Sequence, residues 1–222
     1  QIGSRIVRTF VSGDFFGQNL KGGDSLRLRQ AFGSIGRFTA GQTWTTFTDP
    51  NAVPQTLDFE GSTSNVNRRQ GLVRFTQPLG DTGFTLAASL EDPQIIVEVP
   101  SQIEGEGRTE SPDLVSHLRF ERDWGMAQAA FVIRELGFQP VGQPVISETA
   151  WGWNFVGAFQ LIEPTQAYYQ ITFGDGIASY LGSPDIVATG PFSAEISSLF
   201  GWMIGLHHDW SDSLTSNFTF SR

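Results

Sequence analysis

Apolar and polar residues alternate along most of the chain, so that every second residue is apolar in one segment after another. Alternation of period two is typical of β-strands with one apolar and one polar face, whereas an amphipathic helix repeats every three to four residues. Helical periodicity is hard to find. The pattern predicts eleven strands, which occupy residues 5–16, 25–34, 37–47, 69–78, 84–91, 113–122, 126–135, 149–162, 167–177, 199–209 and 214–222.

The connections between these strands alternate in length. Short turns such as "LGDTG" and "EPTQ" carry Gly, Asp and Pro, which favour tight reversals. The connections between the turns are longer and polar, and they occupy residues 17–24, 48–68, 92–112, 136–148 and 181–198. This regular alternation is expected of an up-and-down meander in which one rim carries loops and the other carries turns.

The strand lengths are compatible with a membrane, and two further observations favour a membrane for this meander over water. No segment approaches 18 consecutive apolar residues, which excludes a transmembrane helix, but a transmembrane strand needs only about 9–11 residues. No arginine or carboxylate falls in the middle of an apolar strand face, where an arginine costs roughly 2–4 kcal/mol in a bilayer. All six tryptophans lie near strand ends, as in two aromatic girdles: Trp44, Trp124, Trp151, Trp153, Trp202 and Trp210. The predicted fold is therefore an all-β, transmembrane, antiparallel up-and-down β-barrel.

The polar strand faces should then line the lumen. In strand 25–34, Leu26, Leu28 and Phe32 are assigned to the apolar face and the arginines to the other, with Gln30 as an exception on the apolar face. The same parity turns an arginine set inward: Arg8, Arg27, Arg29, Arg74, Arg119 and Arg134. The inward acids are Asp14, Glu91 and Glu121. This excess of arginine favours anions in the pore. An equally weighted alternative is that the arginines stabilise the wall by pairing with Asp14, Glu121 and carbonyl groups.

Composition removes several other classes of function. The formal net charge is −9, which argues against nucleic-acid binding by bulk attraction, and Lys21 is the single lysine among 14 basic residues. Cysteine is absent, so disulfides and thiolate metal sites are excluded. No Ser/His/Asp arrangement, phosphate-binding loop or zinc spacing is evident, so we expect no catalytic residues, metal or cofactor.

Two long connections carry open alternatives. The connection 48–68 is long enough to fold inward and narrow the pore, and the alternative is that it packs outside on the barrel rim. Residues 91–113 hold seven carboxylates, which could bind a divalent cation against lipid phosphates, although simple solvation is the favoured interpretation. We treat residues 1–222 as one barrel domain. Because single-chain bacterial barrels have even strand numbers, eleven strands predict a segment of a longer barrel, incomplete at both ends, unless a strand was missed or the sequence is incomplete.

Residues 26–75 resemble the DcaP-like porins of Gram-negative outer membranes. The resemblance rests on the paired arginines of "LRLRQAF", on "GQTWTTFTDP", on "LDFEG" and on "NRRQGLVRF", with later support from "ITFGDGIASYLG" and "HHDWSDSLTSNFTFS". It implies a homotrimeric, 16-stranded barrel in the outer membrane, surrounded by lipid and lipopolysaccharide, that passes small anionic solutes such as dicarboxylates through an arginine-lined pore. By position the motif marks Arg27, Arg29 and Arg74, together with Arg68 and Arg69 at the end of the long connection.

A second class of function remains as an alternative. A soluble all-β protein that binds a ligand or carbohydrate would also show half-buried, alternating strands. The two hypotheses differ in how the protein is extracted from cells. A porin requires detergent, whereas a soluble sandwich does not.

Overall fold

The computed structural model describes residues 6–18, 24–54, 56 and 62–222. The start of the predicted strand 5–16, most of the connection 17–24 and the "LDFEG" motif lie outside the described residues. The strands are β1 (Val7–Gln18), β2 (Asp24–Ile35), β3 (Phe38–Trp44), β4 (Arg69–Pro78), β5 (Phe84–Glu91), β6 (Val97–Glu98), β7 (Gly105–Gly107), β8 (Asp113–Arg122), β9 (Gly125–Pro140), β10 (Ile146–Ile162), β11 (Thr165–Asp175), β12 (Ile186–Gly190), β13 (Ser193–Ile196), β14 (Ser198–Ser211) and β15 (Leu214–Ser221). Two short 3₁₀ helices are η1 (Pro50–Ala52) and η2 (Ala178–Leu181).

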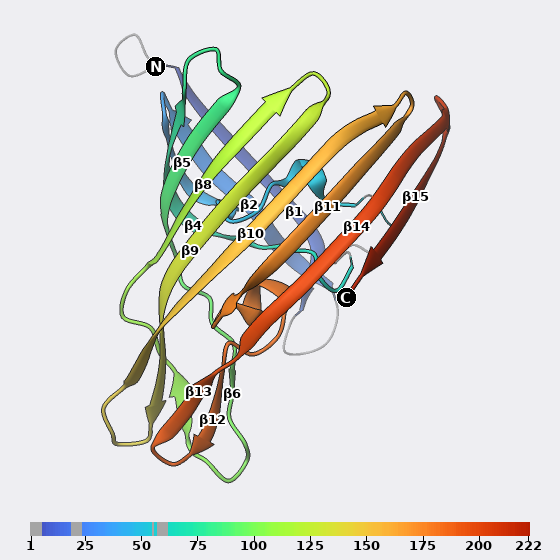
Figure 1. The fold of residues 1–222 in the computed structure, drawn as a ribbon. Coiled ribbons are helices and arrows are strands. Elements are labelled where there is room, and N and C mark those ends of the chain that lie inside the picture. Colours follow the sequence, from blue (N-terminus) through green and yellow to red (C-terminus); the bar gives the residue numbers. More distant parts are fainter. Residues whose placement is uncertain (1–5, 19–23, 55, 57–61) are drawn as a thin grey trace.

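Within the described residues, one curved antiparallel sheet contains twelve strands, and eleven of them form a path in which each pairs with the next long strand of the chain (Figure 1). Their order is β1-β2-β3-β4-β5-β8-β9-β10-β11-β14-β15. Each of the eleven predicted strands corresponds to one of these, so the predicted up-and-down meander is confirmed. Because neighbours in sequence are neighbours in space, local alternation was sufficient to define this topology.

The two rims of the sheet differ as the connection lengths predicted. One rim has only tight turns, while at the other β9 and β10 extend well beyond their neighbours (Figure 1). Against this extension β7 pairs with β9, and β6, β12 and β13 form a separate three-stranded sheet in the order β13-β12-β6. Phe138, Ile186 and Ala188 make a small core between them. The long connections therefore fold into a projection with its own apolar packing.

A β-bulge lies between β1 and β2. Ser12 pairs with Gln30 but the next residue, Gly13, pairs with Leu28, so Arg29 is an extra residue on β2. An extra residue shifts the phase of the alternation on the strand that carries it. Side chains of β2 on the two sides of Arg29 therefore follow opposite parities.

The bulge corrects the assignment of Phe32. The hydroxyl of Thr43, which is buried on the inner face, donates to Gln30 Oε1 at 2.8 Å, so Gln30 also points inward. Phe32 is two residues further along the same strand and shares this inner face, where its ring packs on Phe10 with centroids 5.6 Å apart. The prediction that Phe32 shares the apolar outer face with Leu26 and Leu28 was wrong, and Gln30 is no exception to the pattern.

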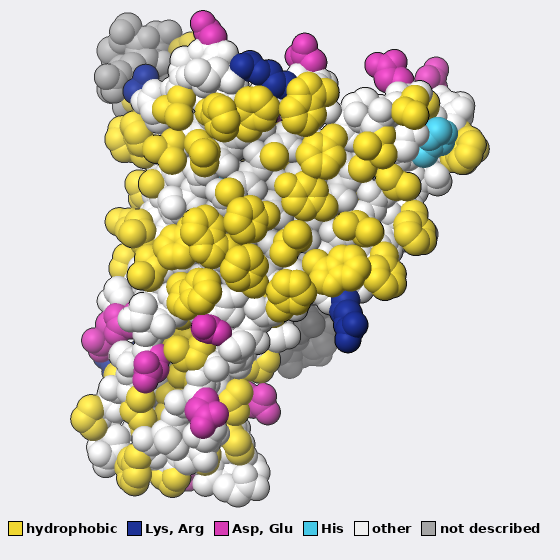
Figure 2. Space-filling model, in the orientation of Figure 1, with side chains coloured by type: hydrophobic (Ala, Val, Ile, Leu, Met, Phe, Trp, Pro, Cys, Tyr) yellow, Lys and Arg dark blue, Asp and Glu magenta, His cyan; other side chains and the backbone are white. Residues whose placement is uncertain are grey.

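The convex face of the sheet is covered by large apolar side chains that remain exposed (Figure 2). Between the two rims, hydrophobic side chains form a broad band, and acidic side chains gather at its ends (Figure 2). The band includes Val73, Leu86, Leu90, Leu118, Ile171, Phe200, Ile204 and Phe220, each more than a third exposed. The chain therefore places apolar residues on both sides of the sheet, but only the concave side buries them.

No helix in the described ranges is long and apolar enough to cross a membrane.

The main apolar cluster lies within the concavity. Phe47 and Val66, from the connection between β3 and β4, pack with Val115, Ala130 and Val132 of β8 and β9. Ile177 and Tyr180, in and beside η2, complete the cluster. Two connections from the long-loop rim thus enter the concavity of the sheet and supply part of its apolar core.

Candidate pore wall and its inserted loops

The connection between β3 and β4 lies against the inner face of the sheet. The carbonyl of Phe47 accepts a hydrogen bond of 2.8 Å from Asn154 Nδ2 on β10, and the N–H of Val66 donates to Gln170 Oε1 on β11 at 3.4 Å. Further toward β8, the carbonyl of Thr46 is 2.8 Å from His117 Nδ1. Of the two alternatives for this connection, the described part takes the inward one.

Glu91 anchors the start of this connection. Its carboxylate is almost fully buried and accepts from the hydroxyls of Thr45 (2.6 Å) and Ser89 (2.7 Å). It also accepts from the N–H of Thr46 (2.8 Å) and from Gln70 Nε2 (2.6 Å). Four donors thus satisfy the hydrogen-bonding capacity of this buried carboxyl group, as is usual for polar groups enclosed away from water.

Four arginines line the inner face of β1, β2 and β4. The register places Arg8 opposite Ser34, Ser34 opposite Thr39, and Thr39 opposite Arg74. Three strand spacings separate Arg8 from Arg74, or about 14 Å. The two arginine residues thus lie in one row across the wall.

Arg27 and Arg29 share one acid. The Arg27 side chain donates to both oxygens of Asp14, at 3.0 and 2.8 Å, and Arg29 Nη1 lies 3.0 Å from the same carboxylate. The Arg27 and Arg29 side chains remain 45% and 31% exposed. Two positive charges against one negative leave this cluster with an excess of positive charge that is accessible to water.

Arginines on the opposite wall are neutralised by pairs of acids. Arg119 on β8 contacts Asp49 of the inserted connection and Glu121 of its own strand. Arg134 on β9 is fully buried, with Asp113 Oδ1 at 3.1 Å and Asp185 Oδ2 at 3.6 Å. Parity did turn Arg134 inward, but the connections cover it, so its guanidinium lies inside the wall and does not face open lumen.

Arg68 and Arg69 border a cavity of about 440 Å³. Arg68 Nη1 donates to the carbonyl of Gln94 (3.1 Å) and Nη2 to that of Ser179 (2.7 Å), with the guanidinium carbon 4.5 Å from the ring centre of Tyr180. Arg69 diverges from it and stacks on Trp44, with its guanidinium carbon 3.7 Å from that ring. Burial raises the pKa of Tyr180 well above its ordinary value, so its hydroxyl stays protonated.

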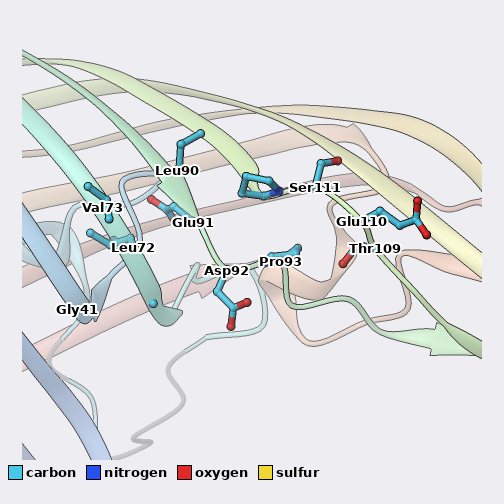
Figure 3. Close-up of a pocket in the computed structure, with 12 residues that line it drawn as sticks. Gly41, Leu72, Val73, Leu90, Glu91, Asp92, Pro93, Thr109, Glu110 and Ser111 are labelled. Carbon is cyan, nitrogen blue, oxygen red and sulfur yellow. The ribbon is translucent and has the colours of Figure 1, made fainter.

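A second cavity, of about 640 Å³, lies where β3, β4 and β5 end at the long-loop rim (Figure 3). Asp92 and Glu110, from the acidic connection after β5, border it beside Leu72 and Leu90. Nowhere in the described ranges do three or more His, Asp or Glu side chains gather as a metal site. The cation-bridging alternative for this connection thus has no cluster to support it.

The structure brings together two of the predicted groups and adds partners that the sequence did not reveal. Asp14 joins Arg27 and Arg29, and Arg119 joins Glu121. The missed residues are the acids Asp49, Asp113 and Asp185 and the loop anchors Asn154 and Gln170. A signal was present for the anchors, because each is a large polar residue on the inner face of a strand.

The continuous order of antiparallel neighbours from β1 to β15, the apolar convex face and the polar concavity define the curved wall of a β-barrel of the porin type. Among solved structures, the chain is similar to the crystal structure of the outer membrane channel DcaP of Acinetobacter baumannii, with a TM-score of 0.88 at 21% sequence identity. The match covers all of this chain and 62% of that one. A scan against protein-family models and a search of curated proteins found no match. At this identity the likeness establishes a shared fold.

Proposed function

We propose that the chain forms most of the barrel of a bacterial outer-membrane channel, through which small hydrophilic solutes diffuse passively, with a preference for anions such as dicarboxylates. The observation that carries the proposal is the separation of the two faces of one sheet. The outer face exposes large apolar side chains, while the concave face carries arginines and buried polar residues. The fold shared with the outer membrane channel DcaP supports the same function.

The outer face suits lipid better than water. Exposed apolar patches on soluble monomers rarely exceed a few hundred Å². Here exposed Leu, Ile and Phe side chains recur from β4 to β15 without interruption (Figure 2). A soluble ligand-binding protein, the second candidate, would have to hold this whole surface in water. We therefore favour the membrane and place the protein in the outer membrane.

The preference for anions rests on the wall formed by β1, β2 and β4. Its inner face carries Arg8, Arg27, Arg29 and Arg74. Asp14 pairs there with two of them, Arg27 and Arg29. Rings of arginine in a pore favour anions, and a guanidinium group pairs bidentately with carboxylate or phosphate. The wall that includes Arg119 and Arg134 contributes less, because each of these arginines is matched by two acids.

The proposal also extends to assembly and partners. We expect a homotrimer in contact with lipid and lipopolysaccharide, as the sequence resemblance to DcaP-like porins implies. Diffusion through a pore needs neither cofactor nor metal, and no catalytic activity is assigned.

Single-channel recording in planar bilayers tests the proposal. The protein is extracted in detergent, inserted into a bilayer and exposed to a KCl gradient. We expect discrete conductance steps and a reversal potential with the sign of chloride preference. A reversal potential of the opposite sign would refute the anion preference, and a protein that is soluble in plain buffer and forms no channels would refute the porin assignment.

A further inference from the structure

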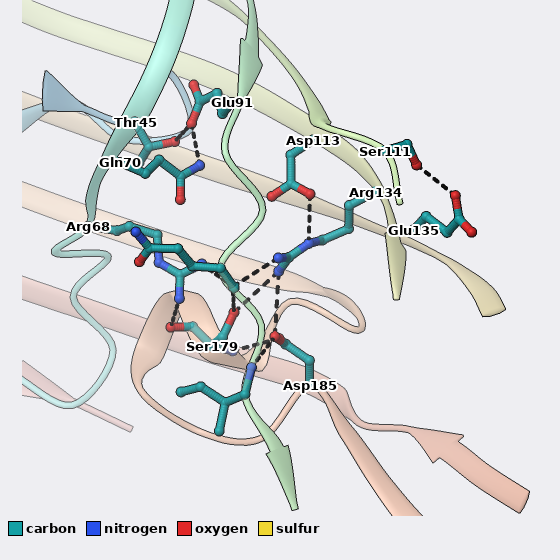
Figure 4. Close-up of polar contacts among 12 residues, drawn as sticks. Thr45, Arg68, Gln70, Glu91, Ser111, Asp113, Arg134, Glu135, Ser179 and Asp185 are labelled. Carbon is teal, nitrogen blue, oxygen red and sulfur yellow. Dashed lines mark hydrogen bonds and ion pairs between the residues drawn. The ribbon is translucent and has the colours of Figure 1, made fainter. Parts of the chain in front are cut away.

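Arg134 lies where four segments distant in sequence meet (Figure 4). Its side chain leaves the inner face of β9 and is fully buried together with Asp113 of β8 and Asp185, which precedes β12. Besides these two acids, Arg134 Nη1 donates to Ser179 Oγ at 3.2 Å and Nη2 to the carbonyl of Gln94 at 2.9 Å. One guanidinium group therefore joins the barrel wall to two separate connections of the long-loop rim.

Asp185 strengthens the same junction. Its Oδ1 accepts the N–H of Ser179 at 2.7 Å, and its Oδ2 accepts the N–H of Ile96 at 3.2 Å. The backbone N–H of Asp185 donates in turn to the carbonyl of Ile96 at 2.8 Å. The segment around Gln94 and the turn that contains Ser179 are thus held to each other as well as to Arg134.

Arg68 uses the two residues that Arg134 holds. The carbonyl of Gln94 accepts from both guanidinium groups, and Ser179 offers its hydroxyl to Arg134 and its carbonyl to Arg68 (Figure 4). The place of Arg68 in the cavity wall is therefore set by acceptors whose own positions depend on Arg134.

The two arginines differ in electrostatics. Arg134 has two carboxylates within 4 Å, so its charge is compensated inside the wall. For Arg68, no carboxylate of the described residues lies within that distance, and its bonds go to neutral carbonyls beside the 440 Å³ cavity. Arg68 therefore contributes a positive charge to this cavity, next to that of Arg69, which stacks on Trp44.

We propose that Arg134 is a positioning residue for the pore. It holds Gln94 and Ser179 in place, and these two residues in turn hold the positively charged side chain of Arg68 at the edge of the cavity. The inference rests on the proposed function, because it assigns Arg134 a part in anion preference without contact with the solute. A lysine could not replace it, since a single ammonium group lacks the planar fork that reaches several acceptors at once.

A double-mutant cycle in bilayers tests this role. The permeability ratio of chloride to potassium is measured for the wild type, Arg68→Gln, Arg134→Lys and the double variant. Arg134→Lys keeps a positive charge beside Asp113 and Asp185, so the barrel should still fold, which heat-modified gel mobility verifies. We expect each single variant to lower the ratio and the double variant to lower it no further than Arg68→Gln alone, because both act through one group.

Arg108→Gln is the matched control. Arg108 belongs to the same rim, but it is half exposed and pairs with Glu110 at 3.7 Å, so its loss should leave the ratio unchanged. A wild-type ratio in Arg134→Lys, or an additive loss in the double variant, would overturn the positioning role while the channel itself stands. Failure of Arg134→Lys to insert would overturn it too, since the residue would then serve folding alone. Absence of channels in the wild type would instead defeat the proposed function.

Discussion

The two inner walls of the sheet have the same alternating pattern but different surroundings. On the wall of β8 to β11, the inserted connections bury Val132, Asn154 and Gln170 almost completely. On the wall of β1 to β4, the side chains of Arg27 and Arg29 remain 45% and 31% exposed, and Arg8 is exposed. The first wall resembles the core of a soluble protein, and the second resembles the lining of a channel.

This difference shows that an inward side chain acquires its role from what covers it. Arg134 and Arg27 both point into the concavity, yet the first is enclosed by two acids and two connections while the second shares one acid at the surface. Removing an uncovered residue should therefore change permeation directly, whereas removing a covered one should change stability and reach permeation only through the connections that it holds.

The largest effect is expected at Phe47, a fully buried side chain of the inserted connection. Phe47→Ala should lower the free energy of unfolding by about 3–5 kcal/mol, because it leaves a cavity between the connection and the wall. It should also raise single-channel conductance as the connection loosens. The control is Phe10→Ala on the uncovered wall, where the ring is 47% exposed. Equal losses for the two variants in urea unfolding would contradict the comparison.

An intermediate effect is expected at Asn154, which donates to the Phe47 carbonyl and accepts from the Thr172 hydroxyl at 3.0 Å. Asn154→Leu keeps the volume but leaves buried polar groups without partners, at a cost of about 1–3 kcal/mol. Thr39→Val on the uncovered wall serves as the control and should be nearly neutral, because water reaches that face. Urea unfolding in detergent distinguishes the two, and an unchanged midpoint for Asn154→Leu would argue against a dry interface.

The smallest effect on stability is expected at Arg8. Because its side chain is exposed, Arg8→Gln should change the free energy of unfolding by no more than about 0.5 kcal/mol. The chloride-to-potassium permeability ratio should nevertheless fall, since one charge is lost from the lining. A fall in stability without a change in the ratio would reverse the roles that we assign to the two walls.

Most of the strand framework could be predicted from the sequence, because alternation and turn residues act locally. The eleven long strands were found in this way, whereas β6, β7, β12 and β13 were not, since two to five residues within polar connections carry no clear period. The prediction of the face on which Phe32 lies was wrong for a related reason. One extra residue at Arg29 reverses the parity, and nothing in the local composition marks it.

The candidate site was less predictable, because it depends on contacts between distant segments. Parity gave the direction of Arg119 and Arg134. Their partners Asp49 and Asp185 belong to connections, and the alternation of apolar and polar residues does not predict the path of a connection. The inward course of residues 45–54 and 62–68 depends likewise on Asn154, Gln170 and Glu91 acting together. Such long-range pairing leaves only isolated polar residues in the sequence as a signal.

Cysteine accessibility tests the contrast between the two walls most directly, because the chain has no native cysteine. Ser34→Cys lies on the uncovered wall between Arg8 and Arg74, and Val132→Cys lies on the covered wall, where Val132 is fully buried. Each variant is inserted into a bilayer and treated with a charged, membrane-impermeant thiol reagent. We predict rapid reaction and a fall in conductance for Ser34→Cys, and no reaction for Val132→Cys. Equal reaction rates at the two positions would contradict the account.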